Sequence, residues 1–184
     1  MALTGYKKTC GKQSGGVRSL FLIEKDKIKS LTLEAAKKTY SAIAMAAAAA
    51  FARYEFKEDE AEFKETTKVE NGSVMVTQEV TLVLPKMGDA SRVAVEELAD
   101  ISPCGMVGVV VDNMGNTRVV GYNEEQKDSR PLRLSQSEGT TGKALSDATG
   151  ETVTLTCNTT EKAYLFTGDV DALTTPAVDP APGS

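Results

Sequence analysis

A glycine-rich run in the last third of the chain is the first candidate for chemistry. Residues 139–144 read Gly-Thr-Thr-Gly-Lys-Ala, and a phosphate-binding loop uses such glycines and a lysine to cradle phosphate oxygens. That loop needs a glycine five positions before Gly142 and a serine or threonine after Lys143. Ser137 and Ala144 occupy these two positions. The pattern therefore favours a flexible loop between two strands over a nucleotide site.

A second candidate is the group of carboxylates formed by residues 58–60 and Glu62. Oxygen ligands of this kind suit a hard divalent cation. The run lacks the glycine and the aspartate spacing of a calcium loop, so a solvated turn between strands is the preferred interpretation. The Asp-Asn-Met-Gly-Asn run at residues 112–116 is interpreted in the same way, because these residue types also favour a tight turn.

Cysteine and histidine usage argues against an enzyme. Cys10, Cys104 and Cys157 are widely spaced and form no CxxC pair, and the chain contains no histidine. A thiol nucleophile, a triad or a zinc site would need bases or ligands that the sequence lacks. We therefore expect free, buried thiols, no enzymatic activity, no catalytic residues, and no cofactor or metal.

The charge balance bears on partners. Twenty-one basic and 26 acidic residues give a net charge of −5, which argues against a groove that binds nucleic acid by bulk charge. The same balance suits a channel wall that nucleic acid passes without sticking, and it is also ordinary for a soluble protein. The apolar run at residues 42–51 is too short to span a bilayer, so we expect no membrane insertion.

Hydrophobic patterns predict a mostly β chain with one helix. Dense or alternating apolar runs predict strands, and a helix with Asp89 or Ser91 as its cap is predicted from an apolar stripe that ends at Ser102-Pro103. Residues 34–52 leave helix and strand equally open, because the alanines at 46–50 favour helix while the flanking segments favour strand. The predicted strands lie at residues 17–23, 28–33, 53–57, 61–65, 74–84, 106–111, 117–122, 131–134, 152–157 and 163–166.

A hairpin is the strongest local signal. Asn71-Gly72 is a preferred two-residue turn, and residues 74–84 beyond it alternate between an apolar face and a Thr- and Glu-bearing face. Gln78 is the one interruption on the apolar face. We predict an N-terminal arm at residues 1–16, a β-rich structural domain at 17–170 and a flexible Pro/Ala-rich tail at 171–184. The predicted fold class is α+β, mostly β: an antiparallel β-sandwich or barrel with one packed α-helix.

The order of these segments resembles virion structural proteins of tailed phages, in particular a tail-tube-like family from phages of Bacteroides-type hosts, including crAss-like ones. The resemblance spans about residues 9–168 and rests on element order. The segments that carry it are Cys10-Gly11-Lys12, Gly15-Gly16, Leu20 to Ile23, Tyr54-Glu55-Phe56, Asn71-Gly72, Val80 to Met87, Val109 to Gly115, Val120-Gly121-Tyr122, Ser137 to Thr140 and Thr152 to Thr156.

The resemblance implies a self-assembling subunit of a tail tube or of a ring in the tail or neck. Such subunits join strands with their neighbours into an inner barrel, and their loops and arms contact the next ring. We expect a homo-oligomeric ring, six-fold in symmetry, assembled in the host cytoplasm and stacked around a channel through which genomic DNA passes without sequence-specific binding. Thr77, Glu79 and Thr81 are the lumen-facing candidates. The alternative is a capsid or head decoration protein, or a fibre-linked binding protein.

Overall fold

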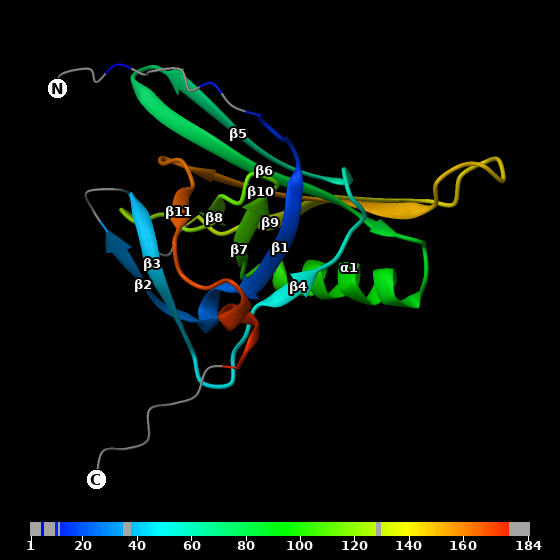
Figure 1. Ribbon diagram of the computed structural model, residues 1–184, viewed down its shortest axis with the longest axis horizontal. Helices are drawn as coiled ribbons and strands as arrows, with labels where there is room; N and C mark the ends of the chain where they lie inside the picture. Colours follow the sequence, from blue (N-terminus) through cyan, green and yellow to red (C-terminus); the bar gives the residue numbers. More distant parts are fainter. Residues whose placement is uncertain (1–4, 6–9, 11, 35–37, 128–129, 177–184) are drawn as a thin grey trace, which may run out of the picture.

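Two β-sheets and one α-helix make up the fold (Figure 1). The computed structural model describes residues 5, 10, 12–34, 38–127 and 130–176. The mostly β composition with one helix confirms the coarse prediction, an α+β chain that is mostly β. Most of the predicted arm and residues 177–184 of the predicted tail lie outside the described residues.

The larger sheet has seven strands. In the order in which they lie side by side, they are β2 (Ile28–Glu34), β3 (Thr39–Met45), β11 (Tyr164–Phe166), β8 (Thr117–Val120), β7 (Met106–Asp112), β1 (Val17–Glu24) and β4 (Ala52–Tyr54). The central strands β1 and β7 are antiparallel, and each contains a continuous apolar run, Leu20 to Ile23 in β1 and Met106 to Val111 in β7. Such continuous apolar runs are typical of strands that are buried on both faces.

Two apolar clusters lie on opposite faces of β1. Leu20 and Leu22 join the cluster that faces the smaller sheet and the helix, whereas Phe21 and Ile23 join the other cluster. The second cluster also contains Phe51 and apolar side chains of β2 and β3. These side chains cover the face of β1 that points away from the smaller sheet. The central strands of the larger sheet are therefore covered on both faces.

The smaller sheet has four antiparallel strands in the order β5 (Ala61–Glu70), β6 (Ser73–Pro85), β10 (Gly150–Thr159) and β9 (Arg133–Thr140). The predicted hairpin is confirmed, because β5 and β6 pair throughout and Asn71 and Gly72 both have positive φ, 51° and 79°. Positive φ at both central residues is the geometry of the tight hairpin turn that Asn-Gly favours.

The helix α1 (Asp89–Ile101) follows the end of β6 and buries Leu98 against the first cluster. Its cap differs from the prediction: Gly88 occupies the capping position, and Ser91 is the third helical residue. The Ser91 hydroxyl accepts a hydrogen bond from the Gly88 N–H and donates one to the Gly88 carbonyl. Ser91 thus stabilises the helix start from inside the first turn.

The alanine run does not form a helix. β3 ends at Met45, and residues 46–50 form a turn in which Ala48 has a φ of 61°. The Ala46 N–H donates to the Lys27 carbonyl at 2.8 Å, so this turn is held by the 3-10 helix Lys25–Lys27 that precedes β2. Tertiary pairing outweighs the helix propensity of alanine here, because alanine side chains offer little packing that would favour a helix.

The predicted start of the flexible tail at residue 171 needs correction. Asp171–Thr174 form a 3-10 helix, and Leu173 is buried in the second cluster. The Phe51 N–H donates to the Leu173 carbonyl at 2.9 Å. The folded region therefore extends beyond residue 170, because Leu173 covers the alanine turn. Among the described residues, no helix has the length and apolar character needed to cross a membrane.

Candidate functional site

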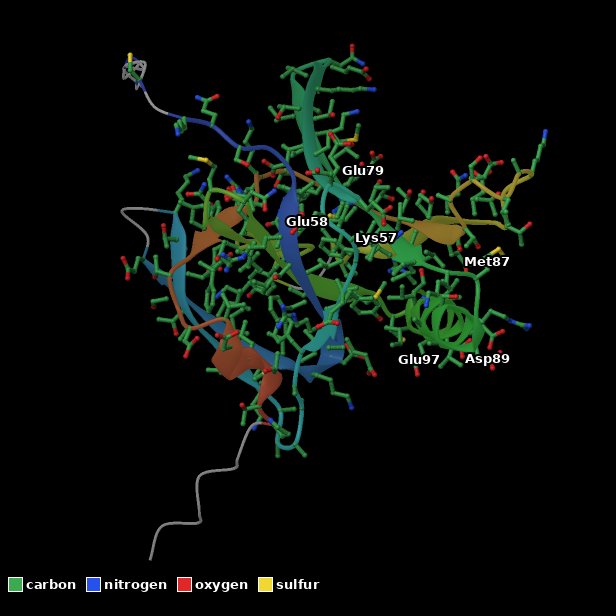
Figure 2. All side chains as sticks on the ribbon, turned by 45° about the vertical axis from the view of Figure 1, so that its right-hand side comes forward. Lys57, Glu58, Glu79, Met87, Asp89 and Glu97 are labelled. Carbon is green, nitrogen blue, oxygen red and sulfur yellow. The ribbon has the colours of Figure 1, made fainter. Side chains whose placement is uncertain are left out.

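The outer face of the four-stranded sheet is the candidate functional surface. On β6, Val76, Gln78, Val80 and Leu82 are buried, whereas the alternate side chains are partly exposed. Thr77, Glu79 and Thr81 all lie on this exposed side, as the alternation predicts. Figure 2 shows Glu79 in the middle of the hairpin and Met87 beyond the end of β6, near the start of α1.

Hydroxyl groups surround the three candidates. Thr81 lies opposite Thr154, with their hydroxyl oxygens 3.5 Å apart, and Thr77 donates to the side-chain carbonyl of Asn158 at 2.8 Å. Glu79 lies opposite Thr156 on one side and Lys64 on the other. Strand β10 contributes alternate threonines because its sequence reads Thr-Val-Thr-Leu-Thr, with the valine and leucine buried.

Charges of both signs are mixed on this face. The register brings Glu62 beside Thr81, Lys64 beside Glu79 and Glu138 beside Thr152, all pointing to the exposed side. Glu58 and Asp59 instead lie in the turn before β5, where Asp59 has a φ of 64°. The face is hydroxyl-rich and has no dominant sign of charge, so it offers polyphosphate no concentrated positive potential.

Two strand edges of this sheet are open within the described part of the chain. The order β5-β6-β10-β9 leaves the outer edge of β5 and the outer edge of β9 without a paired strand. β9 is exposed at almost every position from Arg133 to Thr140. An open edge presents unpaired backbone N–H and C=O groups, which readily pair with another strand.

Gln78 is a buried polar residue whose hydrogen-bond network the sequence analysis did not predict. Its side chain is 1% exposed, and its carbonyl oxygen accepts hydrogen bonds from the Gly121 N–H at 3.0 Å and from the Cys157 thiol at 3.4 Å. Its amide group donates to Glu65 and to the Glu161 carbonyl, both at 3.4 Å. Gln78 lies between Val76 and Val80 on the buried face of β6. A polar side chain at such a position needs buried hydrogen-bond partners, so this pattern could have predicted the network.

The three cysteines have different surroundings. Cys157 is buried, and burial raises the pKa of its thiol to about 12, so the thiol stays protonated at neutral pH. Cys10 and Cys104 are exposed, which contradicts the expectation of buried thiols. Cys104 is exposed because it lies in the turn after α1, where the Cys104 and Gly105 N–H groups both donate back to the Ile101 carbonyl.

The glycine-rich run has its backbone donors already occupied. Gly139 and Thr140 end β9, and a loop at residues 141–149 connects β9 to β10. The Asp147 carboxylate accepts the N–H groups of Lys143 and Ala144, each at 2.8 Å. These are donors that a phosphate-binding loop would point at its ligand. The geometry thus agrees with a loop between two strands.

Three tyrosines form an aromatic cluster on the larger sheet. Tyr40 packs against Tyr122 and Tyr164, with ring centroids 5.8 and 5.5 Å apart. Burial and the neighbouring Glu124 carboxylate raise the pKa of Tyr40 well above its usual range, and burial and Glu161 raise the pKa of Tyr164 to about 12. The Tyr40 and Tyr164 hydroxyls donate hydrogen bonds to Glu124 and Glu161 respectively. Both tyrosines therefore stay protonated and hold loops to the larger sheet.

No group of three or more His, Cys, Asp or Glu side chains that could hold a metal ion occurs in the part of the chain that the structure describes. The carboxylates at residues 58–60 and Glu62 are divided between a turn and a strand face. Comparison of the chain with protein-family models, with curated proteins and with solved structures finds no match in any of the three.

Proposed function

We propose that this chain is a phage virion structural protein, a subunit of a tail tube or of a ring in the tail or neck, which self-assembles into stacked rings around a DNA-passage channel. The observation that carries the proposal is the four-stranded sheet with one buried face, one hydroxyl-rich face and two open edges. The proposal places this sheet in the wall of the channel, with Thr77, Glu79 and Thr81 toward the lumen.

Strand directions favour closure of such a ring. Neighbouring strands alternate in direction from β5 through β6 and β10 to β9, so β5 and β9 run in opposite directions. If β9 of one copy meets β5 of the next, their pairing is antiparallel, like every other pairing in the wall. Closure into a barrel removes open edges altogether, which is how β-proteins avoid uncontrolled edge-to-edge association.

The outer face suits the passage of DNA without retention. A wall rich in lysine and arginine would bind phosphates and release counterions, which holds DNA in place at low salt. Here the threonine hydroxyls and the mixed charges of Glu62, Lys64 and Glu79 give no such attraction. Two further parts of the proposal, the six-fold symmetry and the virion location, rest on the family resemblance alone.

Electron microscopy of the purified full chain tests the proposal directly. We expect rings, and stacks of rings at higher protein concentration, with a central channel lined by the four-stranded sheet. A chain that stays monomeric at every concentration and salt condition would contradict the proposal. Rings whose four-stranded sheet faces outward would instead favour the alternative, a capsid decoration or fibre-linked protein.

A proline substitution separates edge pairing from folding. Ser135 lies at the register shift in β9, between Leu134, which pairs with Leu155, and Gln136, which pairs with Thr154. Ser135→Pro removes one N–H at a position without a partner in β10, and proline is tolerated at edges and bulges. We expect a folded subunit that no longer forms rings in sedimentation velocity, whereas Ser135→Ala assembles normally. Normal rings with Ser135→Pro would exclude β9 as the joining edge.

A further inference from the structure

A pocket of about 300 Å³ lies on the face of the larger sheet that points away from the smaller sheet. Its apolar lining belongs to the second cluster or packs against it, and consists of Ile28 and Leu31 of β2, Val107 of β7, and Tyr122. Figure 1 shows β2 at the edge of the larger sheet, on the side of the molecule opposite α1. The pocket is therefore separate from the outer face of the four-stranded sheet.

Three lysines give this pocket a positive charge. Lys25, Lys29 and Lys127 line it, together with the hydroxyl-bearing Ser30. Among the described residues, no aspartate or glutamate lines the pocket, although the whole chain carries a net charge of −5. Charges of one sign around a cavity repel one another and concentrate the potential inside it, so an anion bound there would be stabilised.

Carboxylates close to these lysines in the chain neutralise them poorly. The Lys127 Nζ lies 4.0 Å from the Glu124 Oε1, and the Lys127 side chain is 71% exposed, so this ion pair is weak. Asp26 follows Lys25 in the chain but is exposed and does not line the pocket. Lys25 is half-buried and makes no ion pair within the described part of the chain. A half-buried lysine without a counter-ion gains most from a bound anion.

Hydrogen bonds fix the two segments that carry Lys25 and Lys127. The Lys25 N–H donates to the Gly105 carbonyl at 3.1 Å, which ties the 3-10 helix before β2 to the residue before β7. In the loop that carries Lys127, the side-chain carbonyl of Asn123 accepts the Gln126 N–H at 2.9 Å, and Asn123 itself is 1% exposed. A pocket whose walls are ordered in advance loses less conformational entropy when a ligand binds.

We propose that this pocket binds a small phosphate monoester whose organic group is aromatic or otherwise apolar. With a second pKa of about 6, a phosphate monoester carries nearly two negative charges at neutral pH, which suits three ammonium groups better than one carboxylate does. Lysine binds phosphate as a point charge, and Ile28, Leu31 and Tyr122 supply apolar surface for the organic group. The cavity has the volume of a small-molecule site, so it suits a monoester rather than a polymer.

Calorimetric titration of the full chain with three probes tests this chemistry. We expect phenyl phosphate to bind at least about fivefold more tightly than inorganic phosphate, which lacks the ring, and than benzoate, which carries a single charge. The affinity for phenyl phosphate should fall as salt is raised, because salt screens the lysines. Equal affinity for inorganic phosphate would indicate an adventitious ion only and would overturn the proposal. Equal affinity for benzoate, or no binding of phenyl phosphate, would also overturn it.

Removal of single charges locates the binding site. Lys25→Gln and Lys127→Gln should each weaken the binding of phenyl phosphate about tenfold, since one charge-assisted contact corresponds to about that factor in affinity. Lys127 is largely exposed, so Lys127→Gln keeps the test decisive if Lys25→Gln fails to fold. Lys68→Gln is the matched control, because Lys68 is exposed on β5 and does not line the pocket. Equal weakening in the control, or unchanged binding in the pocket variants, would overturn the proposal.

Competition with duplex DNA distinguishes a small monoester from nucleic acid. We expect a short duplex to leave the binding of phenyl phosphate unchanged, because its phosphates are diesters on a rod too wide for the cavity. Displacement of phenyl phosphate by the duplex would assign the pocket to nucleic acid and overturn the proposal. This inference is independent of the proposed function. A chain that forms rings without binding phenyl phosphate would overturn only the inference, and a monomeric chain that binds phenyl phosphate would overturn only the proposed function.

Discussion

The strands at the centres of the two sheets differ in how many of their faces are buried. In β7, six consecutive residues from Met106 to Val111 are buried, because the first cluster lies on one side and the second cluster on the other. In β6, buried and partly exposed residues alternate from Val76 to Leu84. The central strand of the larger sheet is therefore covered on both faces, whereas the central strand of the smaller sheet has one face partly exposed.

This difference also explains the residue types on each strand. A strand packed on both faces needs apolar side chains at every position, and β7 is composed of methionine, valine and glycine up to its last residue. A strand packed on one face needs them at alternate positions only. Threonine satisfies the free face well, because it favours the extended backbone and carries a hydroxyl that solvent can hydrate. The threonines of β6 and β10 fit that requirement.

The sharpest test of the comparison uses two neighbouring residues on one strand. Leu82 is completely buried, and Leu82→Asp would place an unpaired charge in the first cluster. We expect loss of folded protein, because the cost of about 3–5 kcal/mol or more approaches the whole stability of a domain this size. Circular dichroism and thermal unfolding measure it.

The matched substitution Thr81→Asp adds the same carboxylate to the outer face, one residue away. It should cost about 1 kcal/mol or less, and that cost comes from Glu62, which lies directly opposite. Similar losses in the two variants would mean that β6 is buried on both faces, which would contradict the contrast drawn here.

The next largest effect is expected at Gln78. Gln78→Met keeps the side-chain volume but leaves the Gly121 N–H without its partner inside the protein. We expect a decrease of about 1–3 kcal/mol in the free energy of unfolding, the usual cost of an unsatisfied buried donor. Denaturant unfolding gives the value. The outward neighbour serves as a control, since Thr77→Val should change stability by about 0.5 kcal/mol or less. A neutral Gln78→Met would show that the polar network contributes nothing to the junction of the two sheets.

An ion pair joins β7 and β8 in the larger sheet, where β7 ends. Asp112 pairs with Arg118 of β8 at 2.7 Å. Burial alone would raise the pKa of Asp112, but hydrogen bonds from Arg118 and Asn116 outweigh it and lower the pKa below its usual value. Because the pKa is lower in the folded state, this contribution to stability is complete above the unfolded pKa of about 4 and is lost as pH falls through the folded pKa.

We therefore expect Asp112→Asn to destabilise the protein by about 1 kcal/mol at pH 7 and by less in acid. The measurement is the free energy of unfolding of both proteins between pH 7 and pH 3. A difference that stays constant down to pH 3 would contradict a role for the ionised carboxylate.

The sequence predicted most strands because their patterns are local. The run at residues 17–23 and the alternation at 74–84 each determine how the strand is buried, and Asn71-Gly72 determines the turn between β5 and β6. The partly exposed side of Thr77, Glu79 and Thr81 follows from the same alternation. These predictions needed no knowledge of which strands are neighbours.

What the sequence could not predict depends on distant contacts. Residues 46–50 turn because of the Lys27 carbonyl and because Leu173 packs over Phe51, and neither contact is visible in a run of alanines. Gln78 seemed to interrupt a strand because its partners Gly121 and Cys157 are far away in the chain. The open edges of β5 and β9 depend on the order of all four strands, which no local pattern encodes.

Glu79→Lys is expected to change stability least, and it tests most specifically whether the partly exposed face of β6 lines a channel. Glu79 is partly exposed and lies opposite Lys64, so Glu79→Lys places two positive charges side by side and should cost about 0.5 kcal/mol. If this face lines a channel, each ring gains one lysine per copy in its lumen, and assembled tubes should then retain duplex DNA at low salt and release it as salt is raised.

Glu79→Gln, which removes the charge without inverting it, should leave DNA retention near the wild-type level. The measurement is the DNA that co-sediments with tubes between 50 and 200 mM salt. Tubes of Glu79→Lys that form normally but retain no more DNA than the wild-type chain would place this face outside the channel, and the hydroxyl-rich face would then need a different explanation.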